Sequence, residues 1–305
     1  MLLPSRATGA ETHTDGVATH FDKTGDVSGG CGVPPSRAES RHVVALNVWH
    51  TPGEFKEAVT PRPVPDAQSE LKGLWDNGRN CGRWVRISLG DYCKGKNSGA
   101  AGTGICRGGT WTSDRYNGAT LDAVVTDSCG DANEWCRSNY EHLDITRHSL
   151  PKFRLHGRPI GDIEGAGRWN NRKIEWKFIP APRDRGDVKL ALGRGASKWY
   201  VPLLLTDLPN GVHGVQVLKN GRWQRAERNG DNGQWYNLPP NPSGTYTVRI
   251  VDADDKLVHG GREYTFQVPA SCAERCPTDY TPLDYRTSER SDAAKDAASN
   301  TAPAG

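Results

Sequence analysis

Eight cysteines constrain the fold of this 305-residue chain more than any other feature of its sequence. Six of them form three close pairs, at positions 93 and 106, 129 and 136, and 272 and 276, which leaves Cys31 and Cys81. An even number of closely spaced cysteines is typical of a disulfide framework formed in an oxidising compartment. A zinc site is the alternative, but no C-x2-C pair occurs and the single C-x3-C has no pair of histidines nearby. We therefore expect disulfides, with no metal and no cofactor.

Length and composition narrow the class of protein. A chain of this length suits two domains better than one core. Its net charge of +3 argues against a dedicated nucleic-acid-binding protein, and no apolar run approaches the roughly 20 residues of a membrane helix. Ten tryptophans stand against five phenylalanines. Excess tryptophan indicates either a core or an exposed surface on which flat sugar rings stack, and composition does not choose between them.

The amino-terminal residues do not match the secretion that the cysteines predict. The opening six residues lack the apolar stretch of a signal peptide. We expect an extracellular protein nonetheless, with its true start upstream or its leader removed.

The first half of the chain has the texture of an all-β domain, because short apolar runs alternate with Gly, Pro, Asn and Asp. Residues 1–15 predict a disordered lead. The Pro- and charge-rich residues 51–80 predict a surface insertion with a helical turn near residues 68–74. The expected elements are strands at Val17–Phe21, His42–Val48, Arg83–Leu89, Leu121–Thr126 and Lys173–Ile179, and a helix at Ile145–Phe153.

The second half predicts a β-sandwich that follows a linker at Pro180–Gly186. The pair Asn220 and Gly221 between apolar runs is a strong hairpin signal. From residue 270 onward, low hydrophobicity predicts a disordered tail in which Cys272 and Cys276 close a small loop. The expected strands are Val188–Leu192, Val201–Leu205, Gly214–Leu218, Arg222–Arg228, Thr245–Val251 and Glu263–Val268.

Short motifs in both halves carry a family resemblance. The first half contains, in order, Gly16–Phe21, Gly29–Gly32, Asn80–Gly82, Val125–Cys129 and Glu141–Asp144. That order resembles the six-stranded double-psi β-barrel of expansins, a barrel that also occurs in the related family 45 glycoside hydrolases. Two motifs of the second half, at residues 195–200 and 219–223, resemble the cellulose-binding β-sandwich of bacterial expansins. The resemblance covers roughly residues 16–269.

The resemblance implies a mainly β fold in two domains. Its expected boundaries are a lead at 1–15, the barrel at 16–180, a linker at 181–186, an immunoglobulin-like sandwich at 187–269 and a tail at 270–305. It also implies a secreted monomer that binds plant cell-wall polysaccharide and loosens the wall without hydrolysis. Cellulose is the expected ligand, with xyloglucan or pectin as further candidates, and neither nucleic acid nor membrane is expected as a partner.

Two carboxylates are candidates for chemistry in the first domain. Asp127 ends an apolar run, and Asp144 follows His142-Leu143. Such carboxylates either act as proton donors with a raised pKa or cap a turn or helix. By resemblance, Asp144 matches the hydrolases' general acid and the expansins' essential aspartate, and Asp127 matches a second groove carboxylate. Thr19 matches a threonine that hydrogen-bonds near Asp144. Phe21 matches an aromatic of the groove, or is a core ring.

No residue of this chain matches the catalytic base of the family 45 hydrolases. An ungapped comparison with the hydrolases puts Lys23 at its position and Asp22 one residue away, which in a strand is the opposite face. Two alternatives to the expansin reading stay open. One is an endoglucanase with Asp144 as acid and Asp22 or Asp26 as base. The other is a barwin-like defence or carbohydrate-binding protein without loosening activity.

The loop between the two aspartates contains Trp135, which lines the polysaccharide groove or covers a disulfide. Local spacing, together with family position for the first three, predicts four bridges. They are Cys31–Cys81, Cys93–Cys106, Cys129–Cys136 and Cys272–Cys276.

An adjacent aromatic pair, Trp199 and Tyr200, is the candidate binding platform of the second domain. In a regular strand the two rings would point to opposite faces, but Pro202 favours an irregular segment at the surface. By resemblance, both rings belong to an exposed row that stacks on glucan. The third aromatic of that row has no match, which leaves Trp235 or Tyr236 as substitutes. Gly193 stands where the family has an assisting lysine.

Overall fold

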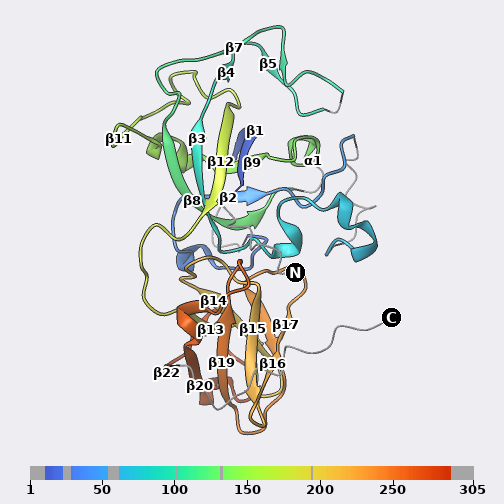
Figure 1. Ribbon diagram of the computed structural model, residues 1–305, viewed down its shortest axis with the longest axis vertical. Helices are drawn as coiled ribbons and strands as arrows, with labels where there is room; N and C mark the ends of the chain where they lie inside the picture. Colours follow the sequence, from blue (N-terminus) through green and yellow to red (C-terminus); the bar gives the residue numbers. More distant parts are fainter. Residues whose placement is uncertain are drawn as a thin grey trace, which may run out of the picture. The chain divides into compact units, whose positions relative to one another are not determined.

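The computed structural model describes residues 11–22, 29–53, 62–100, 102–130, 133–193 and 195–289. The chain divides into two compact units (Figure 1). The barrel unit comprises Met1–Gly25, Ser40–Asn77 and Arg83–Pro182, and the sandwich unit comprises Asp26–Glu39, Gly78–Gly82 and Arg183–Gly305. Two short segments from the first half of the sequence thus belong to the second unit, where the Cys31–Cys81 disulfide joins them.

The barrel unit is built on a closed sheet of six strands. Their order is β8-β2-β9-β1-β12-β3, and a further pairing of β3 with β8 closes the barrel. The pairs β1–β9 and β2–β8 are parallel, and the other four are antiparallel. The strands are β1 (Thr12–Phe21), β2 (Val43–Leu46), β3 (Trp84–Leu89), β8 (Thr120–Ser128), β9 (Leu143–Thr146) and β12 (Lys173–Ile179).

Alternating side chains give strand β12 an inner and an outer face, whereas every residue of β2 and β9 is buried. In β12, Ile174 and Trp176 are buried, whereas Lys173, Glu175 and Lys177 are exposed. This period of two places apolar groups on the inner face and charged groups on the outer face. The five strands expected in this unit are all present, with ends shifted by a few residues.

Shorter elements surround the barrel. In the barrel unit they are η3 (Asp66–Leu71), η4 (Asp76–Gly78, whose last residue is assigned to the sandwich unit), β4 (Tyr92–Cys93), β5 (Lys96–Asn97), β6 (Cys106–Arg107), β7 (Trp111–Thr112), α1 (Glu134–Ser138), η5 (Arg147–Lys152), β10 (Arg154–Leu155) and β11 (Arg158–Pro159). The turn η1 (Pro35–Arg37) belongs to the sandwich unit. The helix expected at residues 145–153 is wrong. Its first residues belong to β9, which is buried between β1 and β2, and the rest form the 3-10 turn η5, which contains Pro151.

The sandwich unit consists of two five-stranded sheets with orders β17-β18-β14-β13-β21 and β16-β15-β19-β20-β22. The first sheet contains β13 (Lys189–Leu192), β14 (Val201–Thr206), β17 (Glu227–Arg228), β18 (Trp235–Leu238) and β21 (Thr281–Pro282). The second contains β15 (Gly214–Lys219), β16 (Arg222–Arg225), β19 (Thr245–Val251), β20 (Glu263–Gln267) and β22 (Tyr285–Ser288), and two turns, η6 (Val258–Gly261) and η7 (Ala270–Cys272), lie outside the sheets.

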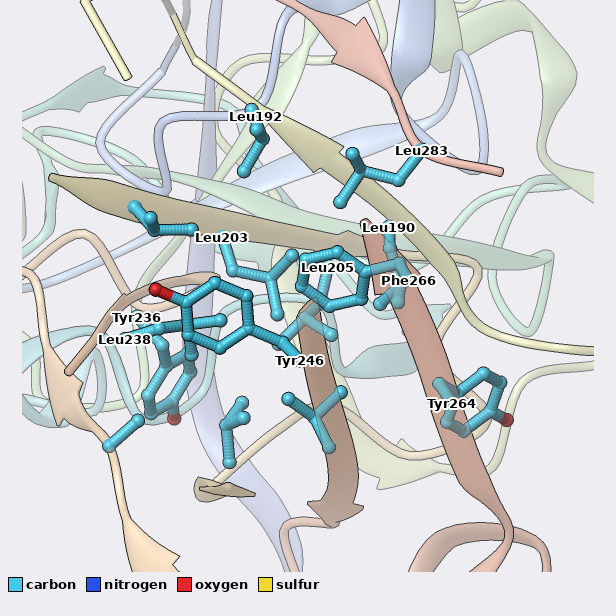
Figure 2. Close-up of a cluster of buried hydrophobic side chains, with 14 of the residues drawn as sticks. Leu190, Leu192, Leu203, Leu205, Tyr236, Leu238, Tyr246, Tyr264, Phe266 and Leu283 are labelled. Atoms are coloured by element: carbon cyan, nitrogen blue, oxygen red, sulfur yellow. The ribbon is translucent and has the colours of Figure 1, made fainter. Parts of the chain in front are cut away.

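Side chains from both sheets make one apolar core (Figure 2). Leu203 and Leu205 come from the first sheet, and Tyr246 and Phe266 come from the second. The expected hairpin is confirmed, because β15 and β16 pair across Asn220 and Gly221, both at positive φ. Positive φ at both central residues is the backbone of the tight turn that Asn-Gly favours.

The disordered tail expected from residue 270 is wrong for residues 270–289. They form η7, β21 and β22, which add an edge strand to each sheet. Low hydrophobicity does not indicate disorder here, because an edge strand needs few apolar side chains to pack on the core. In this segment Leu283 and the partly buried Tyr285 provide that packing. Residues 290–305 lie outside the described residues.

The four predicted disulfides are confirmed, and all eight cysteines take part. Within the described ranges, no helix is both long enough and apolar enough to cross a membrane.

Candidate functional site

Asp144 occupies the centre of a three-stranded part of the barrel wall. Its strand, β9, lies between β1 and β2, and the register puts Thr19 on one side and Ala45 on the other. Ala45 is also the register partner of Asp127 on β8. The two carboxylates therefore lie on either side of the Ala45 side chain, each on a strand next to β2. Neighbouring strands are about 4.8 Å apart, so this register brings the aspartates within reach of one ligand.

A chain of hydrogen bonds holds the Asp144 carboxyl. The Thr19 hydroxyl donates to Asp144 Oδ1 at 2.9 Å and lies 3.0 Å from His142 Nε2. Because a hydroxyl has one proton, the Thr19 oxygen that donates to Asp144 accepts its second bond from the His142 ring. Burial lowers the pKa of His142 to about 3. The imidazole is therefore neutral at ordinary pH and positions the threonine without adding charge.

Asp144 keeps its proton to an unusually high pH. Burial is the main cause, and it raises the pKa of this carboxyl to about 6. The Thr19 hydrogen bond acts in the opposite direction, and the Asp127 charge adds a smaller increase. Asp127 itself is half-buried and accepts a hydrogen bond from the Ser128 backbone N–H at 2.8 Å. Near pH 5 the site can thus donate a proton or a hydrogen bond from Asp144.

The two barrel aromatics lie beside the Cys129–Cys136 disulfide. Phe21 is half-buried and packs against this bridge and Ala45. Trp135 is also half-buried, and its ring stacks on His142 with centroids 6.1 Å apart. Its other surroundings form a hollow of about 220 Å³ that includes Ser98, Gly99, Ala100 and Thr103. Trp135 therefore lines a cavity and packs on His142, whose ring lies near the two bridge sulfurs.

The residues considered as a hydrolytic base differ in their placement. Asp22 is exposed, and its Oδ2 lies 3.4 Å from Arg147 Nη1. Lys23 and Asp26 lie outside the described residues.

One cluster near the site has metal-ligating residue types. The ligand atoms of Cys129, Cys136 and His142 all lie within 4.8 Å of one another. Both sulfurs, however, are joined in a disulfide, so they do not offer the thiolates that zinc requires.

In the sandwich unit, Trp199 and Tyr200 lie together in a tight turn before β14. The Ser197 hydroxyl accepts hydrogen bonds from both of their backbone N–H groups at 3.2 Å, and Ser197 N–H donates to Tyr200 O at 2.7 Å. Because a turn does not alternate faces as a strand does, both rings reach solvent, with 61% and 47% of their surfaces exposed. The Lys198 ammonium lies 5.1 Å from the Trp199 ring.

The surroundings of the turn stabilise it. Cys276 N–H donates to Ala196 O at 2.7 Å, so the Cys272–Cys276 loop supports the chain that leads into the turn. Pro202 lies within β14, opposite Asn237 of β18 and beyond the end of the β13 pairing at Leu203. Its missing N–H therefore costs no bond to β13.

The two substitutes for a third aromatic lie on opposite faces of β18. Trp235 is half-buried and lines a hollow that also includes Tyr200. Tyr236 is 1% exposed, belongs to the core and donates from its hydroxyl to Val212 O at 3.4 Å. Tyr280, which sequence reasoning missed, lines the same hollow as Trp235. No sequence signal pointed to it, because it lies in the segment expected to be a tail.

Comparison with known proteins finds similarity in fold but not in sequence. No family model matches it, and no curated protein matches its sequence. Two crystal structures of Clavibacter michiganensis expansin are similar, one of the apo protein and one of an Asp-to-Asn mutant in complex with cellohexaose. Each is 17% identical with a TM-score of 0.50. The alignment with the apo protein covers 88% of this chain and 97% of the other, and that with the mutant covers 87% and 95%. The expansin-like fold expected from the sequence is confirmed: a closed six-stranded β-barrel and a β-sandwich in one chain.

Proposed function

We propose that this protein is a secreted, expansin-like protein that binds cellulose and loosens plant cell walls without hydrolysing glucan. The sandwich unit binds the polysaccharide, and the barrel unit acts on contacts between chains. The four disulfides support an oxidising, extracellular location.

The joint exposure of Trp199 and Tyr200 carries the binding part of this proposal. Two large rings that share one turn and face water leave apolar surface uncovered, and flat sugar rings are suitable partners for it. Each ring adds about 0.5–1.5 kcal/mol beyond the area it buries. The similar Clavibacter protein, solved with cellohexaose, supports a β-glucan as the ligand.

Asp144 carries the loosening part. A protonated carboxyl, aligned by Thr19, can offer hydrogen bonds to glucan oxygens and so compete with the bonds between neighbouring chains. Asp127, half-buried on the same barrel wall, can accept bonds from glucan hydroxyls. Disrupting contacts in this way breaks no covalent bond.

Among the described residues, the arrangement of carboxylates argues against hydrolysis; Asp26, the other candidate base, lies outside them. An inverting glycosidase needs a base on the opposite face of the sugar ring from the acid. Asp127 and Asp144 both belong to one wall, with only β2 between their strands, and the Asp22 carboxylate is paired with Arg147. A ligand over this wall would meet both groups from the same side.

The proposal is tested by wall extension and sugar release together. Wild-type protein should extend heat-inactivated wall strips under load and release no reducing ends from amorphous cellulose. Asp144→Asn should extend nothing while binding cellulose as wild type does.

Each rival reading has its own outcome in that experiment. Steady sugar release that is lost in Asp144→Asn would replace the proposal with an endoglucanase. Cellulose binding without extension by the wild type would favour a carbohydrate-binding protein of the barwin type. Extension by the folded mutant would make Asp144 structural.

A further inference from the structure

A hollow of about 650 Å³ lies beside the exposed aromatic pair, entirely within the sandwich unit. Tyr200 belongs to both, since it is 47% exposed and also lines the hollow. Most of the other walls come from the strap (residues 29–39), the stretch that enters β18, and residues 278–280, and Gly193 and Pro202 complete the lining. Ligand pockets typically measure about 300–1,000 Å³, so a sugar fits here.

We propose that this hollow binds a neutral sugar branch of a substituted β-glucan whose backbone stacks on Trp199 and Tyr200. The inference rests on the proposed function, because those two rings must first hold the backbone. It assigns the sandwich unit a preference for branched over unbranched glucan.

Trp235 forms a fixed apolar wall of the hollow. Its Nε1–H donates to Gly32 O of the strap at 2.9 Å. The far edge of the ring lies so close to Gly193 that a Cβ there would stand 2.7 Å from it. A side chain at position 193 would therefore require the Trp235 indole to move.

Tyr280 provides a second ring. Leu192 on β13 pairs with Thr281 on β21, and this antiparallel register brings Tyr280 beside Gly193. The Arg37 guanidinium lies 4.5 Å from the Tyr280 ring centroid. This stacking holds the ring and the strap together. Three aromatic rings, from Tyr200, Trp235 and Tyr280, therefore line one hollow.

The polar groups of the hollow suit sugar hydroxyls. Asn229 and Asn232 both line it, and Asn229 Nδ2 lies 3.5 Å from the Tyr200 hydroxyl. An amide both donates and accepts, as a hydroxyl does. Arg37 and Asp279, the two charged residues of the lining, have opposite signs. The lining therefore has no net charge, which favours a neutral sugar over a uronate.

The hollow is formed before any ligand arrives. The Cys31–Cys81 disulfide fixes the start of the strap, and Glu39 at its end accepts a hydrogen bond from Asp207 N–H at 2.9 Å. A preformed site does not lose affinity to loop ordering. A straight glucan stacked on the exposed rings would pass the hollow, whereas a sugar attached to that backbone could enter it.

Calorimetric titration with two matched ligands tests the inference. We expect wild type to bind a xylose-branched cello-oligosaccharide at least tenfold more tightly than the unbranched oligosaccharide of equal backbone length. Tyr280→Ala and, separately, Asn232→Ala should remove most of this preference and leave unbranched binding unchanged. Asn232→Ala is included because Tyr280→Ala also removes the contact of the ring with Arg37. Circular dichroism checks that each variant is folded. Trp199→Ala should weaken both ligands alike.

The outcomes separate this inference from the proposed function. If wild type binds both ligands equally and the hollow variants change neither, the branch site is refuted while cellulose binding stands. If wild type binds neither ligand, the proposed function fails and takes the branch site with it. A galacturonate oligomer bound more tightly than the branched glucan, with loss in Tyr280→Ala, would overturn the neutral-sugar assignment.

Discussion

The two units place their candidate sites in opposite environments. In the barrel, strand register buries Asp144 and surrounds it with Thr19 and His142. In the sandwich, a turn exposes Trp199 and Tyr200. A buried acid is suited to controlling a proton, and exposed rings are suited to capturing a surface. We therefore expect the two units to have different tasks. A mutation in the barrel site should impair loosening and not binding, and a mutation of the exposed rings should impair binding.

A buried carboxyl in each unit sharpens the comparison. Burial raises the pKa of Asp144 to about 6 and that of Glu39, in the strap, to about 7. The Asp144 carboxyl accepts a hydrogen bond from the Thr19 side chain, whereas Glu39 accepts one from the Asp207 backbone N–H and also lies near the charges of Asp207 and Arg185. A raised pKa alone therefore does not mark a functional group; its surroundings decide. Asp144 lies on the same barrel wall as Asp127, and Glu39 anchors the strap.

The largest expected effect is on the pH profile of wall loosening. If the protonated form of Asp144 is the active one, loosening should be full near pH 5 and fall about tenfold per unit above pH 6. By pH 8 the loss is roughly a hundredfold. Extension of wall strips at a series of pH values measures this, and cellulose binding over the same range should stay nearly constant.

Thr19→Val is the matched variant for that profile. The Thr19 hydrogen bond lowers the pKa of Asp144, so its removal should move the midpoint of loosening to higher pH. A folded Thr19→Val protein with an unmoved midpoint would show that Asp144 does not set the profile.

Glu39→Gln should stabilise the sandwich unit at high pH. The folded-state pKa of Glu39, about 7, exceeds its ordinary value of 4.5, so the stability that its protonated form provides is complete below pH 4.5 and is lost as pH rises through 7. A glutamine stays neutral at every pH. We therefore expect Glu39→Gln to gain about 2–3 kcal/mol of unfolding free energy at pH 8 and almost nothing at pH 4.5.

Urea denaturation at both pH values measures that difference, with the two units followed as separate transitions. The exposed Glu227→Gln is the control and should change neither. An equal effect of Glu39→Gln at both pH values would mean that Glu39 is not protonated in the folded protein. Wall loosening should not depend on this residue.

Sequence reasoning succeeded where short patterns determine structure. Alternating residues identified β12, and Asn220-Gly221 identified the β15–β16 hairpin. The motif order identified Asp144 and Thr19, which the structure joins by a hydrogen bond. The alternation and the hairpin depend only on neighbours in the sequence, whereas the two site residues are found through the resemblance of the motif order to a known family.

Sequence reasoning failed where distant segments determine structure. Residues 145–146 were assigned to a helix, because nothing local shows that β9 pairs with strands over a hundred residues away. Tyr280 was assigned to a tail, because its order comes from pairing with β13. The strap also lies far in sequence from the sandwich that it joins. Each miss concerns a long-range pairing rather than a propensity.

The next effect in size concerns cellulose binding. The double mutant Trp199→Ala/Tyr200→Ala should bind crystalline cellulose at least tenfold more weakly, which corresponds to about 1.4 kcal/mol or more. Two stacked rings at about 0.5–1.5 kcal/mol each account for that loss. Depletion isotherms measure it. Binding like wild type by the folded mutant would place the platform elsewhere, and Asp144→Asn, from the other unit, should leave the isotherm unchanged.

The smallest effect distinguishes the two adjacent aromatics of β18. Tyr236→Phe removes a buried hydroxyl that donates to Val212 O and leaves the ring in the core. We expect a loss of about 1 kcal/mol in the stability of the sandwich unit, the usual value of one such hydrogen bond, and no change in affinity for branched or unbranched glucan. Trp235→Phe, on the opposite face of the strand, loses the Nε1 bond to Gly32 and reshapes the hollow, so it should weaken branched-glucan binding more than unbranched. Denaturation and titration of both variants therefore separate a core ring from a binding ring in consecutive residues. If Tyr236→Phe instead weakened glucan binding at unchanged stability, the face assigned to the ligand would be the wrong one.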